Sequence, residues 1–112
     1  LGKIDEAEAY LLQRADQLDG NRYGILLSLA ESMETENRYL AASLIYRSLL
    51  NAILERGYAN AYPHGVRYLK KLDKLAVTIF DWNKFDHHDA FKERIMQAHG
   101  RKQSFWSKYE AK

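Results

Sequence analysis

Residues 38–56 constrain the fold more than any other part of the chain, because their apolar side chains would lie on nearly all sides of a helix. These apolar residues are Leu40, Leu44, Ile45, Leu49 and Ile53. A helix of this kind is buried on most of its circumference. We therefore expect it at the centre of an all-α domain, ending before Gly57. No segment alternates convincingly between polar and apolar residues, so we expect no sheet.

Helical periodicity predicts five helices and a short sixth one, at about residues 6–18, 22–34, 38–56, 61–80, 87–100 and 104–109. Asp5 with Glu8, and Asp86 with Asp89, have the spacing of helix caps. The short loops favour antiparallel hairpins. Residues 23–56 fit the tetratricopeptide spacing loosely, and the next window does not. The predicted fold is all-α, with antiparallel helical hairpins stacked as a short tetratricopeptide-like right-handed solenoid.

Length and composition limit the class of protein. The 112 residues are enough for one helical domain, 1–112, and the start at Leu1 leads us to expect a C-terminal fragment of a longer protein. The absence of cysteine excludes disulfides and thiolate zinc sites and is compatible with a cytoplasmic location. No apolar run reaches the roughly 18 residues of a membrane-spanning helix, so we expect no membrane partner.

The net charge of +2 conceals an uneven distribution. Residues 1–36 carry eight acidic and three basic side chains, a net charge of −5, whereas the remaining residues have a net charge of +7. Such an asymmetry can steer a charged partner or orient two copies of the chain. It can equally arise from solvated helix faces.

One predicted helix concentrates cations on one face: Arg67, Lys70, Lys71 and Lys74 recur at three- and four-residue spacing. Arg101 and Lys102 can extend this basic patch. Neutralised phosphates favour such a cluster, and aromatic rings provide stacking surfaces for bases. The candidate rings are Trp106, Phe105, Tyr62 and Tyr68. A face that only keeps the helix soluble is the alternative, and Tyr62 and Phe105 are equally suited to the core.

No motif indicates an enzyme or a metal site. The four histidines, His64, His87, His88 and His99, lack the spacing that zinc ligands need. Only His88, with an acidic neighbour such as Asp89 or Glu93, offers any local pairing of this kind. The sequence also lacks a glycine-rich phosphate loop and a nucleophile elbow. We therefore expect no catalytic residues, no cofactor and no bound metal.

Three groups of residues in the C-terminal half carry a family resemblance: Tyr62-x-His64-x-x-Arg67-Tyr68-Leu69, Asp81-Trp82 and His99-Gly100-Arg101-Lys102-x-x-Phe105-Trp106. They resemble an uncharacterised family of bacterial helical-repeat proteins. The last group is also similar to C-terminal regions of bacterial proteins with SWIM-type zinc fingers. The resemblance implies an all-helical, tetratricopeptide-like C-terminal domain and no catalytic residue. Because the chain has no cysteine, no zinc role carries over.

The last of these motifs also has a structural explanation. Gly100 can adopt the left-handed conformation that ends a helix, and Arg101 and Lys102 can then satisfy its last carbonyl groups. At that negative helix end a partly protonated His99 would be favoured. Phe105 and Trp106 can fold back and cover the end of the helix stack. A structural cap and a binding patch both remain open at this point.

The function that we expect from the sequence is a protein-interaction or scaffold module. Its partner would be a protein or peptide, a neighbouring domain, or a second copy in a homodimer. The alternative is a nucleic-acid-associated module that uses the basic patch and the C-terminal motif.

Overall fold

The chain is all-helical, as predicted. The computed structural model describes residues 3–14, 18, 23–57, 59–82 and 85–110, and these contain no strand. The described helices are α1 (Lys3–Gln13), α2 (Tyr23–Thr35), α3 (Tyr39–Arg56), η2 (Ala59–Ala61), α4 (Tyr62–Ala76), α5 (His88–His99) and α6 (Gln103–Glu110). None of them combines the length and the hydropathy that crossing a membrane requires.

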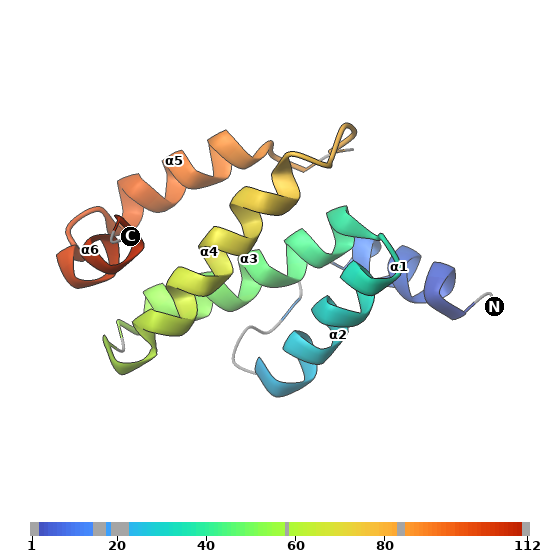
Figure 1. Cartoon of the computed structure of the whole chain (residues 1–112), viewed down its shortest axis with the longest axis horizontal. Helices are drawn as coiled ribbons and strands as arrows, with labels where there is room; N and C mark the ends of the chain where they lie inside the picture. Colours follow the sequence, from blue (N-terminus) through green and yellow to red (C-terminus); the bar gives the residue numbers. More distant parts are fainter. Residues whose placement is uncertain (1–2, 15–17, 19–22, 58, 83–84, 111–112) are drawn as a thin grey trace.

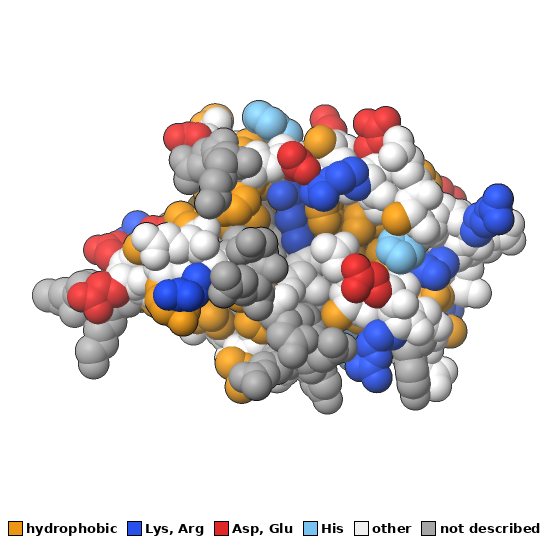
Figure 2. Space-filling model, turned by 180° about the vertical axis from the view of Figure 1, so that it is seen from behind, with side chains coloured by type: hydrophobic (Ala, Val, Ile, Leu, Met, Phe, Trp, Pro, Cys, Tyr) orange, Lys and Arg blue, Asp and Glu red, His pale blue; other side chains and the backbone are white. Residues whose placement is uncertain are grey.

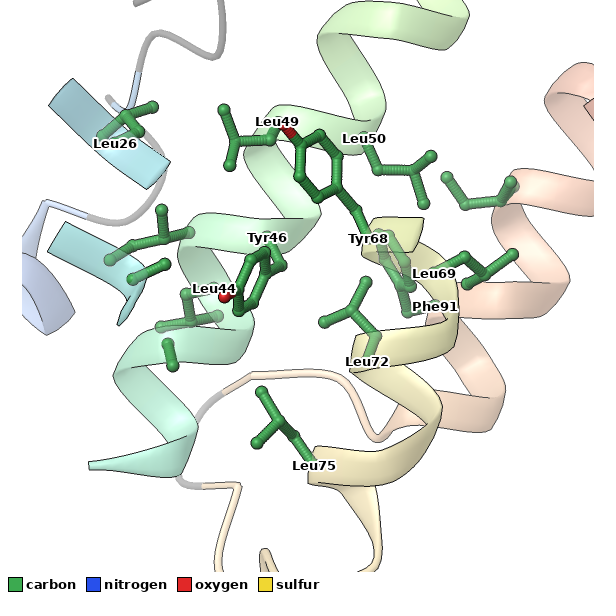
Figure 3. Close-up of a cluster of buried hydrophobic side chains, with 14 of the residues drawn as sticks. Leu26, Leu44, Tyr46, Leu49, Leu50, Tyr68, Leu69, Leu72, Leu75 and Phe91 are labelled. Atoms are coloured by element: carbon green, nitrogen blue, oxygen red, sulfur yellow. The ribbon is translucent and has the colours of Figure 1, made fainter. Parts of the chain in front are cut away.

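Helix α3 lies at the centre of the fold, between α2 and α4 (Figure 1). Ten of its eighteen residues are buried, which confirms the prediction that it is the central helix. Figure 3 shows Leu44, Tyr46, Leu49 and Leu50 of this helix in the buried cluster that it shares with α4. The α4 side chains in the same cluster are Tyr68, Leu69, Leu72 and Leu75.

Helices α5 and α6 complete the fold beside α4, and α6 makes the more extensive contact with it. Phe105 of α6 is 0% exposed. Its ring meets Tyr62 edge-on, at a centroid separation of 5.7 Å. Gly65 leaves room for this packing, since a Cβ atom there would lie 3.1 Å from Phe105 Cε1. The result is a compact arrangement in which the last helix folds back onto α4.

The two predicted capping pairs are wrong. Helix α1 begins at Lys3, so Asp5 and Glu8 lie inside it, and both form ion pairs with Arg38 at the start of α3. The residue that precedes α5 is His87, and the Asp86 carboxylate instead pairs with Arg94. In both cases an arginine elsewhere in the sequence provides a charged partner that the local pattern does not reveal.

Two helices end earlier than predicted. Helix α1 ends at Gln13, not near residue 18, and the predicted terminator Gly20 lies outside the described residues. Helix α4 ends at Ala76, not at residue 80, and Val77 and Thr78 form a turn.

The two glycines predicted to end helices behave differently. Gly57 has the expected left-handed conformation, with φ 64°, and its N–H donates to the carbonyls of Ile53 and Leu54. Gly100 has φ −62° and ψ −21°, which is right-handed, so that prediction is wrong. Its small size has a different use, because a Cβ atom there would lie 2.4 Å from the carbonyl oxygen of Met96.

Candidate functional site

The outer face of α4 carries an exposed row of cations that ends in exposed apolar residues. Arg67, Lys70 and Lys74 are exposed, and Val77 continues the same face at a spacing of three, four and three residues. We call these four residues the α4 stripe. Just beyond it, the Phe80 side chain is 93% exposed. The stripe therefore offers positive charge next to an apolar surface.

Two further predicted residues have identifiable partners near this face. The Nζ of Lys71 lies 3.2 Å from Oε1 of Glu34 on α2. Glu34 also accepts a hydrogen bond of 2.6 Å from the Tyr46 hydroxyl. Lys71 therefore ties α4 to α2 and is partly neutralised. His64 is exposed at the start of α4, where its Nδ1 contacts the guanidinium of Arg67.

The four aromatic rings predicted as stacking surfaces are all buried: Tyr62, Tyr68, Phe105 and Trp106. Trp106 meets the ring of Phe105 edge-on, with centroids 5.0 Å apart. Tyr68 packs against Tyr46 of α3 at 5.9 Å. Because these rings lie in the core or against it, they are not available to stack on bases.

The C-terminal motif closes the end of α5 in a different way from the one predicted. The His99 carbonyl accepts hydrogen bonds from the indole Nε1 of Trp106, at 2.9 Å, and from the backbone N–H of Lys102, at 3.1 Å. The indole therefore replaces the predicted side chains of Arg101 and Lys102 as the cap. The Arg101 side chain is exposed and that of Lys102 is half-buried.

The imidazole of His99 is not favoured in its protonated form, contrary to the prediction. Burial and the charge of Lys102 lower the pKa of His99 below its ordinary value, and the charge of Glu55 only partly opposes this. Burial disfavours a cation more strongly here than the helix end favours it.

A polar network that the sequence did not predict joins α4, α5 and α6. His88 Nε2 lies 2.6 Å from Oδ1 of Asp73, and Lys92 Nζ lies 3.3 Å from the same oxygen. The Tyr109 hydroxyl donates to Asp73 Oδ2 and accepts from Lys92 at 2.9 Å. Burial on its own raises the pKa of Asp73, but the hydrogen bonds from Tyr109 and His88, and then Lys92, lower it overall. His88 thus has an acidic partner on another helix, not the local ones considered from sequence.

A second unpredicted feature is the buried Arg47 of α3. Its guanidinium carbon lies 4.9 Å from the ring centre of Trp82 and 4.7 Å from that of Phe91. Its Nη2 donates to the backbone carbonyl of Asp86 at 2.9 Å. The motif residue Trp82 is therefore held by a cation on the central helix. The signal in the sequence was an arginine in the middle of a mostly buried helix, away from the helix ends.

The described part of the chain contains no group of three or more histidine and acidic side chains that could hold a metal ion. The fold and these surfaces define an all-helical domain. The chain belongs to a family of unknown function, DUF6880, whose model matches residues 2–108. No curated protein and no solved structure matches it.

Proposed function

We propose that the domain is a protein-interaction module that binds an acidic, partly apolar segment of a partner protein on the α4 stripe and Phe80. The observation that carries this proposal is the nearly complete exposure of Phe80, directly after a helix face with three exposed cations. Exposed apolar groups bordered by charge are typical of interaction sites. Opposite charges add specificity and speed the encounter.

The chemistry of the partner follows from the residues of the surface. Carboxylates of the partner would face Arg67, Lys70 and Lys74, and an apolar side chain would cover Val77 and Phe80. In this proposal α2, α3 and α4 are the consecutive helices of a short tetratricopeptide-like scaffold, which presents the stripe on a rigid helix.

The alternative partner is a nucleic acid bound through phosphate contacts of the same cations. The burial of Trp106 and the three other candidate rings removes the stacking contribution that this alternative had drawn from the sequence. A protein partner is therefore the better match, because it also uses the exposed apolar residues.

The test measures fluorescence anisotropy of three labelled probes at about 50 and 200 mM salt, a range over which phosphate contacts weaken steeply. The probes are a peptide of alternating glutamate and leucine, a polyglutamate peptide and single-stranded DNA. We expect the Glu-Leu peptide to bind most tightly. Its binding should be lost in Lys70→Glu with Lys74→Glu, and weakened in Phe80→Ser.

A matched control separates the stripe from general charge. Arg101→Glu with Lys108→Glu changes the net charge equally on exposed residues outside the stripe, and should leave peptide binding unchanged. Tighter binding of DNA, insensitive to Phe80→Ser, would favour the nucleic-acid alternative. Binding of none of the probes at the lower salt concentration would refute the proposal.

A further inference from the structure

The environment of Arg47 is unusual for a buried cation. The residue is only 7% exposed, and its guanidinium lies near the rings of both Trp82 and Phe91. Its Nη2 donates a hydrogen bond to the Asp86 carbonyl, while its Nε has no partner within the described residues. Buried guanidinium groups normally require an anionic partner.

The Asp86 carboxylate, which acts electrostatically on Arg47, is already engaged by a second arginine. Arg94 Nη2 lies 2.8 Å from Asp86 Oδ2, and the Arg94 guanidinium lies 5.9 Å from the same Phe91 ring that Arg47 contacts. Arg47 itself forms no ion pair within the described residues. The Asp86 carboxylate thus pairs with Arg94, and Arg47 reaches only the Asp86 backbone carbonyl, so among the described residues the charge of Arg47 has no ion-pair partner.

The electrostatics of the pair agree with this geometry. Burial, and then the charge of Arg94, lower the pKa of Arg47 to about 10, and Asp86 opposes this only in part. The charged form of Arg47 is thus held in an unfavourable environment, which a bound anion would relieve.

Figure 2 shows the face turned away from the viewer in Figure 1, where Lys and Arg side chains lie among hydrophobic side chains, with an acidic side chain beside them.

We infer that Arg47 and Arg94 form a binding site for a small oxyanion, a carboxylate or phosphate group, between α3 and the start of α5. Guanidinium groups donate paired N–H bonds that match the oxygens of such anions. The anion would neutralise the positive charge of Arg47, which the Asp86 carboxylate does not pair with. It would also hold the segment with Asp86 and Trp82 against α3. This site uses other residues than the α4 stripe and does not depend on the proposed function.

The experiment measures the melting temperature, with phosphate, sulfate or acetate added against chloride at matched ionic strength. Calorimetric titration with phosphate and with acetate gives the dissociation constants. We expect at least one oxyanion to raise the melting temperature above that in chloride. Stabilisation by phosphate and sulfate alone, or by acetate alone, that exceeds the general salt effect measured in Arg94→Gln supports the site and identifies its ligand class.

Two variants keep the inference falsifiable. Arg94→Gln replaces a largely exposed side chain, so it should fold, and should weaken oxyanion binding about tenfold or more, because a hydrogen bond to a charged group is lost. Arg47→Met should abolish binding. The control Arg101→Gln should bind as the unmodified chain does. Equal melting temperatures in all four salts, or an oxyanion effect and dissociation constant that are the same in Arg94→Gln as in the unmodified chain, would overturn the inference.

Discussion

The replacement Phe105→Ala tests whether the C-terminal motif is a structural part of the domain. Phe105 is fully buried, and its ring makes edge-on contacts with Tyr62 and Trp106. The space around it is already filled, since a Cβ atom at Gly65 would lie 3.1 Å from Phe105 Cε1 and 3.3 Å from Leu50 Cδ1. Alanine would therefore leave a cavity that rigid neighbours cannot close.

The expected loss is about 3–5 kcal/mol, the usual cost of truncating a buried phenylalanine to alanine. This is a large share of the roughly 5–15 kcal/mol that stabilises a typical domain. With a urea m-value of about 2 kcal/mol/M, the unfolding midpoint should fall by roughly 1.5–2.5 M.

The assay is urea unfolding, followed by circular dichroism at 222 nm and by tryptophan fluorescence. Trp82 and Trp106 are the two tryptophans of the chain, and both are buried. The control Lys108→Ala, at an exposed position of the same helix, should change stability by no more than about 0.5 kcal/mol. A loss below about 1 kcal/mol in Phe105→Ala, the average for all point mutations, would refute the reasoning. It would mean that α6 is not part of the cooperative core.

Three further predictions concern single residues. Gly57→Ala should lower the free energy of unfolding by about 1 kcal/mol and so lower the melting temperature, because the left-handed backbone strains any side chain even where space is open. An unchanged melting temperature would contradict this. The pKa of His99 is lowered in the folded chain, so the unfolded chain binds more protons near this pKa. The free energy of unfolding should therefore fall as the pH drops below about 6.5. Urea titrations across pH should show this fall in the unmodified chain and not in His99→Gln. The pKa of Asp73 is also lowered in the folded chain, so its contribution to the free energy of unfolding should be present above about pH 4 and be lost on further acidification. In Asp73→Asn, urea titrations should show a smaller loss of stability over the same pH window.

Sequence patterns were most informative where structure depends on local repetition. The apolar circumference of residues 38–56 predicted the central helix, and Gly57 predicted its left-handed end. Both follow from the helical period and from backbone sterics, which act over a few residues. The cationic face of α4 was predictable for the same reason, since side chains three and four residues apart share a helix face.

Sequence patterns were least informative where one residue had a choice of distant partners. Asp5, Glu8 and Asp86 all looked like caps, yet each pairs with an arginine. The sequence left Trp106 open as a stacking surface or as part of a structural cap; it is buried, and its indole caps α5. A local pattern fixes which side chains share a face but not which other element covers that face.

The sequence alone thus determined the helical class, the buried central helix and the chemistry of the exposed α4 face. Only the tertiary structure decided that His88 meets Asp73 and that Arg47 meets both Trp82 and Phe91. These partners are 15 to 44 residues apart in the chain. Contacts at such separations depend on how helices pack, and helix packing leaves no period in the sequence from which such pairs can be identified.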